Sequence, residues 1–267
     1  MLGKASSEAK SSVQYCFDRA ALSYDSSCEL QKKTADHLAS LLANSDQAYT
    51  GVLDLGCGTG VSLESIARKI DIEWIYGLDL AGNMLNTAQH KDLPFVGSKS
   101  SLVQADFHSI PLRSRAVELV TSNMAFQWGE NIPAIISECH RVLKLNGVLA
   151  FSMPNIESFG SLRRAIVETS APNFLNEFPD NQTLRSFVDG DVWQLEYFEE
   201  KTYLQTFVSV SSLLRSFKSF GGNHRSDRHQ AQLLKGHLER LDAYFSDSIP
   251  LQWSIAYVVV KKITEEM

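Results

Sequence analysis

Three glycines and one carboxylate follow a short apolar segment that begins at residue 52. Residues 52–60 read Val-Leu-Asp-Leu-Gly-Cys-Gly-Thr-Gly, which places Asp54 ahead of Gly56, Gly58 and Gly60. Glycine lets a backbone come close to a ligand, because no Cβ lies in the way. A helix that begins after Gly60 would also turn its N-terminal amide groups toward an anion such as a carboxylate. The motif therefore predicts a turn that binds the charged end of a small ligand.

Polar side chains also stand at the ends of the next predicted strands. Asp79, Asp106 and Asn123 each lie at or just beyond such an end, and the carboxyl ends of parallel strands converge in the crevice where open α/β sheets bind ligands. We expect Asp79 to accept hydrogen bonds from both ribose hydroxyls of a nucleoside, and Asp106 to accept one from an adenine amino group. Leu80 and Phe107 are expected on the two faces of the adenine ring.

The glycine spacing and Asn123 narrow the class of ligand. The order G-x-G-x-G differs from the G-x-G-x-x-G of dinucleotide-binding folds, and it favours S-adenosylmethionine over NAD. Asn123 follows the fourth predicted strand, where we expect the sulfonium and its methyl group. A lone aspartate at a strand end is usually a helix cap, but the whole set in this order predicts a cofactor site.

Strand and helix patterns alternate between residues 51 and 152. Strands are expected over 51–55, 74–80, 101–105, 117–122 and 148–152, and helices over 30–42, 61–70, 83–90 and 132–143. This alternation predicts an α/β fold, doubly wound, with a mostly parallel sheet covered on both faces. Beyond residue 152 we expect helices over 159–167, 183–187, 210–220 and 230–245, strands over 193–197 and 203–210 with a turn near Glu199, and a last strand over 252–260.

Four parts are expected along the chain. Residues 1–48 form an N-terminal helical segment that closes over the cofactor, with about ten frayed residues at its start. Residues 49–152 form the S-adenosylmethionine-binding core. Residues 153–248 form a substrate lid or insertion with a late strand and helices, and residues 249–267 form the last sheet strand and a tail.

Net charge, cysteine spacing and the length of apolar runs indicate which partners and which cellular compartment to expect. The net charge of −6 over 267 residues argues against nucleic-acid binding. The four cysteines have no C-x-x-C spacing, which predicts reduced thiols, a cytoplasmic protein and no metal site. Apolar runs are too short to span a bilayer, and no secretory signal is expected.

Positive charge gathers between residues 213 and 240. This stretch carries a charge of +4, which leaves −10 on the rest of the chain. Such a reversal predicts an anionic substrate or partner, and a solvated helix face is the alternative. The basic residues are Arg215, Lys218, Arg225, Arg228, Lys235 and Arg240.

The cofactor motifs resemble those of the class I methyltransferases across residues 50–152, which implies a Rossmann-like, seven-stranded sheet. Segments elsewhere are similar to a narrower family, the malonyl-[acyl-carrier protein] O-methyltransferases of biotin synthesis. The discriminating features are Gln127-Trp128 and the pattern Arg215-x-x-Lys218-x-x-Gly221. The similar segments are 17–25, 30–31, 35–36, 122–128, 138–147 and 214–222.

This resemblance implies transfer of a methyl group to the free carboxylate of malonyl-[acyl-carrier protein], an early step toward biotin, with malonyl-CoA left open as acceptor. A carboxylate is ionised at neutral pH and needs placement rather than a base. Arg215 is the first candidate to hold the carboxylate and Arg19 the second. Tyr24 is expected to close over the cofactor, and Trp128 to wall the pocket together with Phe126.

The carrier protein is acidic, so the basic stretch is its expected docking site, through Arg215, Lys218, Arg225, Arg228 and Lys235. Two other readings remain open. A methyltransferase for a quinone or another small molecule would want a base, for which the sequence offers His108, His140 and His224. An assembly factor for a respiratory complex, built on the same fold, is the third.

Overall fold

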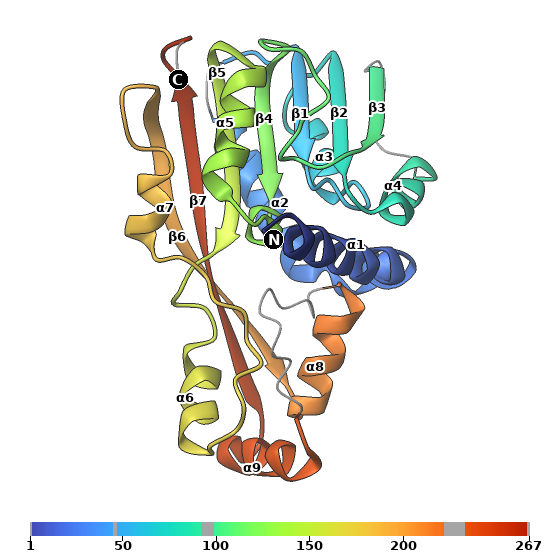
Figure 1. Cartoon of the computed structure of the whole chain (residues 1–267), viewed down its shortest axis with the longest axis vertical. Helices are drawn as coiled ribbons and strands as arrows, with labels where there is room; N and C mark the ends of the chain where they lie inside the picture. Colours follow the sequence, from blue (N-terminus) through green and yellow to red (C-terminus); the bar gives the residue numbers. More distant parts are fainter. Residues whose placement is uncertain (1, 45–46, 92–98, 222–232, 266–267) are drawn as a thin grey trace.

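Seven strands form one sheet in the order β3-β2-β1-β4-β5-β7-β6 (Figure 1). The computed structural model describes residues 2–44, 47–91, 99–221 and 233–265. All neighbouring strands are parallel except that β7 runs antiparallel to β5 and to β6. The strands are β1 (Gly51–Leu55), β2 (Trp74–Asp79), β3 (Lys99–Gln104), β4 (Val117–Asn123), β5 (Leu143–Pro154), β6 (Trp193–Phe207) and β7 (Ile249–Lys262). The predicted mostly parallel, seven-stranded α/β fold is confirmed.

Helices cover both faces of this sheet. The helical elements are α1 (Leu2–Ser27), α2 (Glu29–Ala43), α3 (Val61–Ala67), α4 (Gly82–Gln89), the 3₁₀ turn η1 (Phe126–Trp128), α5 (Ile132–Val142), α6 (Gly160–Glu168), α7 (Asn181–Ser186), α8 (Val210–Ser219) and α9 (Lys235–Phe245). Every residue of β1 is buried, as expected for a strand enclosed on both sides. Val52 packs with the core of α2 and α3, and the next residue, Leu53, packs with the core of α5. Because successive side chains of a strand point to opposite faces of the sheet, the apolar side chains of β1 are divided between two cores.

The strands β6 and β7 extend past the rest of the sheet, and α6, α8 and α9 gather around their far ends (Figure 1). Aromatic rings fill the space among these elements, with Phe159 edge-on to Trp253 at 4.5 Å between centroids. The predicted turn near Glu199 is wrong, because residues 193–207 form one strand and Glu199 pairs with Tyr257 in the ladder. The segment 153–248 therefore supplies an edge strand of the main sheet as well as helices.

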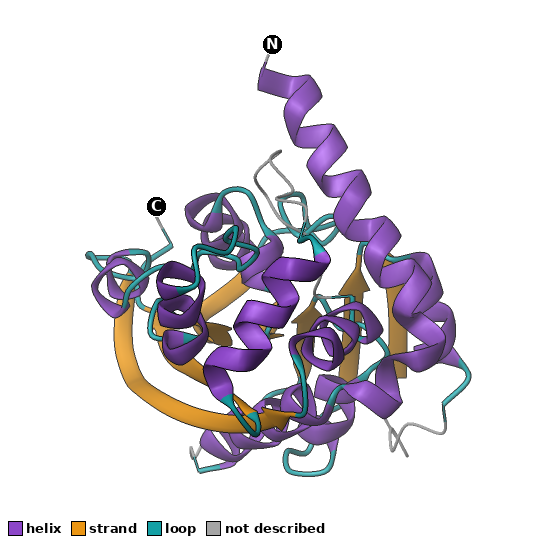
Figure 2. Ribbon diagram, turned by 90° about the horizontal axis from the view of Figure 1, so that it is seen from below, coloured by secondary structure: helices purple, strands orange, loops and turns teal. Residues whose placement is uncertain are grey.

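The N-terminal helix α1 lies across the carboxyl ends of the strands in β2, β1 and β4. Figure 2 shows its first turns projecting from the body of the molecule, and the helix packs against α4 and α8. The chain is helical from Leu2, and the fraying of its first residues stays a prediction. Within the described ranges, no helix is long and apolar enough to cross a membrane.

Candidate functional site

A pocket opens at the carboxyl ends of β1 to β4, with about 730 Å³ of space including its open side. Seven of the nine residues predicted to bind the cofactor line it. These are Gly56, Gly58, Asp79, Leu80, Asp106, Phe107 and Asn123. Tyr24 and Trp128 line the same pocket, whereas Arg215 does not, so one cavity brings together most of the predicted cofactor residues and these two aromatic residues.

The glycine turn has a backbone that only glycine adopts easily. Gly56, Gly58 and Gly60 have φ angles of 69°, 55° and 86°, in the left-handed region. A Cβ on Gly56 would lie 2.4 Å from Cβ of Ala125, whereas a Cβ on Gly58 would meet no atom within 4 Å. The space beside Gly58 is therefore open to a ligand, and Gly60 instead forms the cap before α3.

Asp79 closes the turn from β2. Its Oδ2 accepts a hydrogen bond from the amide of Gly58 at 2.8 Å, and its Oδ1 accepts one from the amide of Ala81 at 2.8 Å. Each oxygen keeps a further lone pair that can accept from a ribose hydroxyl. Burial raises the pKa of Asp79 to about 6, against the lowering effect of these two amides.

Asp54 lies behind the turn rather than in the pocket. Its side chain is fully buried, and its Oδ1 accepts hydrogen bonds from Thr121 Oγ1 at 2.8 Å and Ser62 Oγ at 3.3 Å. Its Oδ2 has no hydrogen-bond partner among the described residues. Burial raises the pKa of Asp54 to about 7. Asp54 thus joins β1 to β4 and α3, and it does not line the pocket.

Asp106 accepts hydrogen bonds from Lys10 and His108 at the edge of the pocket. Lys10 Nζ lies 2.7 Å from Oδ2, and the amide and Nδ1 of His108 lie 2.9 Å and 2.7 Å from Oδ1. Burial by itself would raise the pKa of Asp106, but the hydrogen bonds from Lys10 and His108 lower it below its usual value. This carboxylate therefore stays ionised while it faces the pocket.

Asn123 connects three elements where β4 ends. Its Oδ1 accepts a hydrogen bond from Ser152 Oγ at 2.7 Å, and its Nδ2 donates to the carbonyl of Gln31 at 3.0 Å. These bonds tie β4 to β5 and to the first turn of α2. The pocket floor is consequently fixed at the position expected for the reactive methyl group.

The helix α1 forms a wall of the pocket that sequence reasoning described only at Tyr24. Lys10, Val13, Gln14 and Phe17 line the pocket as well. The apolar positions Val13, Phe17 and Tyr24 recur at helical spacing, and this pattern was the signal that could have located the wall. Burial raises the pKa of the Tyr24 hydroxyl well above its ordinary value, so Tyr24 remains a hydrogen-bond donor.

Two aspartates anchor α1 to the core. Asp18 Oδ1 accepts a hydrogen bond from the amide of Asn83, at the start of α4, at 2.8 Å. Asp25 Oδ1 accepts from Thr59 Oγ1 in the glycine turn at 2.6 Å, and its Oδ2 pairs with Lys91 at 2.6 Å. The wall is thus joined directly to the loop that would carry the ligand.

The aromatic residues of η1 take different places. Trp128 lies on the pocket and packs edge-on against Phe17, with 5.5 Å between ring centroids. Phe126 is fully buried and packs against Phe151 at 5.1 Å. The expectation that Phe126 walls the pocket is wrong, because its ring belongs to the core between α5 and the sheet.

The predicted arginines lie away from the pocket lining. Arg215 and Lys218 are exposed on α8, and neither lines the pocket. Arg19 is exposed on α1 and donates to the hydroxyl of Tyr15 at 3.3 Å. Lys235 forms a long ion pair with Glu239 on α9, at 3.7 Å. The grip of Arg215 or Arg19 on a carboxylate stays a prediction, and Arg225, Arg228 and His224 lie outside the described residues.

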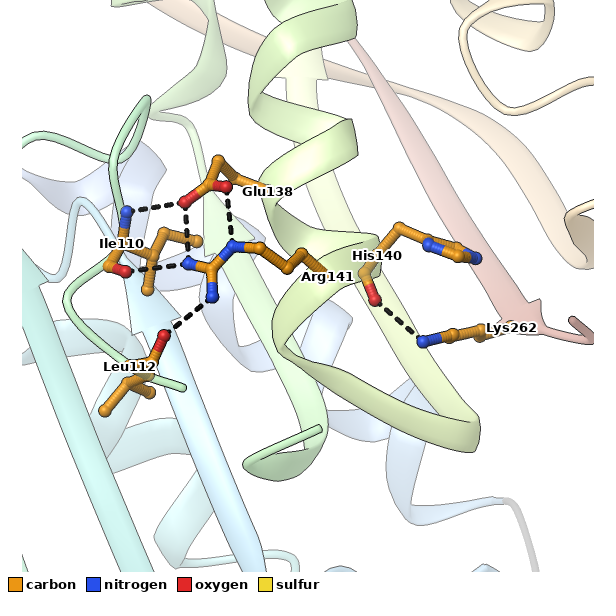
Figure 3. Close-up of polar contacts among 6 residues, drawn as sticks. All are labelled: Ile110, Leu112, Glu138, His140, Arg141 and Lys262. Carbon is orange, nitrogen blue, oxygen red and sulfur yellow. Dashed lines mark hydrogen bonds and ion pairs between the residues drawn. The ribbon is translucent and has the colours of Figure 1, made fainter. Parts of the chain in front are cut away.

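Two residues of α5 fix the loop that carries Asp106 (Figure 3). Arg141 donates to the carbonyls of Ile110 and Leu112 at 2.8 Å and 2.7 Å, and it pairs with Glu138 through two bonds. Glu138 also accepts from the amide of Ile110 at 2.8 Å. These contacts give a structural reason for Glu138 and Arg141 in the segment 138–147.

His140 lies on α5 and does not line the pocket. The buried ring of His140 binds the carbonyl of Thr264 through Nε2, and the carbonyl of His140 accepts from Lys262 at 3.0 Å (Figure 3). His140 thus ties the C-terminal strand to α5, far from the pocket lining. Across the part of the chain that the structure describes, no group of three His, Cys, Asp or Glu side chains is placed to hold a metal ion.

Known proteins resemble this chain in sequence and in shape. Residues 53–151 match the family model of a methyltransferase domain. The malonyl-[acyl-carrier protein] O-methyltransferase of Pseudescherichia vulneris is 32% identical, over 87% of this chain and 88% of its own length. The protein of that name from Laribacter hongkongensis is 27% identical, over 93% and 88%. The crystal structure of a Bacillus halodurans protein proposed to be a methyltransferase has the same fold, with a TM-score of 0.59 at 16% identity, over 86% of this chain and 99% of its own.

Proposed function

Because the chain belongs to the family of the malonyl-[acyl-carrier protein] O-methyltransferases, we propose that it methylates the free carboxylate of malonyl-[acyl-carrier protein] with S-adenosylmethionine. One structural observation supports this proposal independently of the family name. Three of the six segments that resemble the family, 17–25, 122–128 and 214–222, meet at a single wall. Phe17 of α1 packs on Trp128 of η1, and a Cβ on Gly221, after α8, would lie within 2.8 Å of Phe17.

The pocket fits the cofactor by its open glycine turn and by the free lone pairs of Asp79. Gly58 leaves room for the methionine end, Asp79 faces the ribose, and Leu80 and Phe107 flank the adenine. Asn123 holds the floor beneath the reacting centre. When bound, S-adenosylmethionine supplies a methyl group on a positively charged sulfur.

The acceptor needs no general base. A malonyl carboxylate is already ionised at pH 7, so its oxygen forms the new bond to the methyl carbon as the bond from that carbon to sulfur breaks. The positive and negative charges disappear together, and a pocket that excludes water favours this change. Tyr24, which stays protonated because burial raises its pKa, can orient the carboxylate as a donor without removing a proton.

No metal enters this reaction scheme. Alignment of an ionised oxygen with the methyl group is the main requirement, and such placement is worth about 7–11 kcal/mol in well-oriented reactions. We therefore expect a strong chelator to leave the rate unchanged. We place the reaction in the cytoplasm, where the four free cysteines, Cys16, Cys28, Cys57 and Cys139, stay reduced.

The basic stretch is the proposed docking site for the acidic carrier. Arg215, Lys218 and Lys235 are exposed, and opposite charges at a surface accelerate association mainly at low salt. Reversal of the charges of Lys218 and Lys235 should lower the rate with carrier-bound substrate at low salt and have little effect at high salt. An unchanged rate at low salt would remove the docking proposal and leave the reaction proposal intact.

The reaction itself is tested by mass spectrometry of the intact carrier. Malonyl-carrier with enzyme and S-adenosylmethionine should gain the mass of one methyl group, and base should release methanol from the product. Acetyl-carrier, which has no free carboxylate, is the matched control and should not change. Absence of the methyl ester, under conditions in which calorimetry shows that S-adenosylhomocysteine binds, would contradict the proposed acceptor.

A further inference from the structure

His108 presents a buried ring nitrogen at the adenine end of the pocket. The residue lies on the loop after β3 and lines the pocket beside Phe107. Its Nδ1 lies 2.7 Å from Oδ1 of Asp106, and its own amide donates to the same oxygen at 2.9 Å. Its Nε2 is buried and has no hydrogen-bond partner among the residues described.

The contact with Asp106 determines which atom of the ring can accept. An ionised carboxylate is an acceptor only, so Nδ1 must carry the hydrogen. In the neutral ring, Nε2 then has a free lone pair. A buried acceptor without a donor is costly, and such an atom in a native structure calls for an explanation, such as strain, a catalytic role or a bound water or ion.

Asp106 is less free to accept than His108. Its Oδ1 receives two hydrogen bonds from His108, and its Oδ2 receives one from Lys10 at 2.7 Å. Lys10 comes from α1, so the carboxylate joins α1 to the loop. Asp106 Oδ2 keeps one further lone pair, whereas His108 Nε2 has no hydrogen-bond donor at all among the described residues.

We propose that His108, oriented by Asp106, accepts the hydrogen bond from the exocyclic amino group of the adenine and so determines the specificity for this base. Asp106 then acts as a positioning residue, in place of the direct acceptor expected from the sequence. Glu138 and Arg141 act one step further away, because they fix the loop that carries both residues. This inference rests on the proposed binding of S-adenosylmethionine in the pocket.

The test compares two ligands that differ in one group. S-Adenosylhomocysteine and its purine analogue, which lacks only the 6-amino group, are titrated into the full-length protein by calorimetry. The wild-type protein should bind the adenosyl ligand about ten-fold more tightly, as expected for one buried hydrogen bond. In His108→Leu the two ligands should bind with nearly equal affinity, because the acceptor is gone.

Two further variants distinguish a role of His108 in recognition from a purely structural role. His108→Gln retains an acceptor oxygen and should restore part of the preference, which a purely structural role would not do. His90→Leu is the matched control, since His90 is exposed at the end of α4, and it should keep the wild-type preference. Thermal melts verify that each variant is folded.

The two possible failures are distinguishable. If the wild-type protein binds neither ligand, the proposed function itself is wrong, and this inference falls with it. If both ligands bind and folded His108→Leu keeps the ten-fold preference, the cofactor proposal stands and His108 is not the acceptor. In that case, Asp106 accepts the hydrogen bond from the amino group, as expected from the sequence.

Discussion

The ring of Phe17 in α1 lies directly against the α-carbon of Gly221, the residue that follows α8. A Cβ on Gly221 would lie 2.8 Å from Cδ1 and 3.1 Å from Cε1 of this ring. Gly221 also has a φ angle of 77°, a backbone conformation that side chains rarely adopt. The two helices meet a second time where Ser23 Oγ donates to the carbonyl of Ser219 at 3.1 Å. The closeness of α1 and α8 therefore depends on the absence of a side chain at residue 221.

Gly221→Ala should weaken this junction. The added methyl group must displace the ring or the helix, and overpacking of this kind costs about 1–3 kcal/mol. Urea unfolding should show a loss of that size, and the affinity for S-adenosylhomocysteine should fall because Phe17 lines the pocket. In a Phe17→Ala background the same substitution should cost less, since only backbone strain remains. Additive effects of the two substitutions would show that the contact is not tight.

The central part of the fold could be predicted because its signals are local. The buried strand β1 is apolar except for Asp54, and the glycines that follow it mark a turn. The helix α5 has an apolar stripe and a side-chain cap at Asn131. The sheet edge where polar residues gather follows from strand direction alone, which is why Asp79 and Asn123 were placed correctly on the pocket.

The edge strand β6 could not be predicted from its own residues. Glu199, Glu200 and Lys201 suggest a turn, yet they lie in a continuous strand that pairs with β7. Charged side chains are tolerated there because an edge strand has an exposed side. Glu199 also finds partners that are distant in sequence, with His37 of α2 at 2.6 Å. Tertiary contacts of this kind override a local pattern.

The roles of Asp54 and Phe126 were misjudged for a related reason. Motif spacing shows that a residue lies near a site, but it does not show on which side of the strand its side chain falls. Asp54 points behind the turn to Thr121, and Phe126 points into the core toward Phe151. Neither lines the pocket that its neighbours form.

Arg141→Lys should loosen the loop that carries Asp106. The guanidinium contacts two backbone carbonyls and both oxygens of Glu138, and an ammonium group cannot reproduce this planar set. We expect a loss of about 1–3 kcal/mol in the free energy of unfolding, together with weaker binding of S-adenosylhomocysteine.

Arg68→Lys is the matched control for this prediction. Arg68 forms an exposed ion pair with Glu64 at 2.5 Å, one turn away on the surface, and such pairs contribute about 0.3–0.5 kcal/mol. Equal small losses in the two variants would mean that the loop is held by other contacts, and unchanged ligand affinity in Arg141→Lys would separate the loop from the pocket.

Asp54→Asn should change how stability depends on pH. Burial raises the pKa of Asp54 to about 7, compared with about 3.9 in an unfolded chain. Between these values the folded protein binds one proton more than the unfolded chain, so this group makes stability fall as pH rises from about 4 to about 7. The total change is up to about 4 kcal/mol from the shift of about three units. The variant cannot ionise at this position. Its free energy of unfolding should therefore rise relative to that of the wild type as pH increases from about 4 to about 7.

Asp180 provides a control because its pKa is shifted in the opposite direction from that of Asp54. The amide of Thr183 donates to its carboxylate at 2.7 Å at the start of α7 and lowers its pKa. Its stabilising effect is therefore present above about pH 3.9 and is lost as pH falls through the lowered pKa, so Asp180→Asn should lose stability at neutral pH and not in strong acid. Unfolding curves from pH 4 to 8 that run parallel for wild type and Asp54→Asn would contradict the buried titration.

Arg215→Gln should separate recognition of the carboxylate from docking of the carrier. Arg215 and Lys218 are both exposed and lie three residues apart on α8, so each contributes the same charge to the surface. If Arg215 grips the malonyl carboxylate, its loss should lower kcat/KM about ten- to a hundred-fold, the range of a lost charge-assisted hydrogen bond. This loss should appear with a short malonyl thioester as well as with malonyl-carrier, and it should persist at high salt. Lys218→Gln should affect only the carrier-bound substrate, and only at low salt. If both variants behave like Lys218→Gln, Arg215 is a docking charge, and another residue holds the carboxylate.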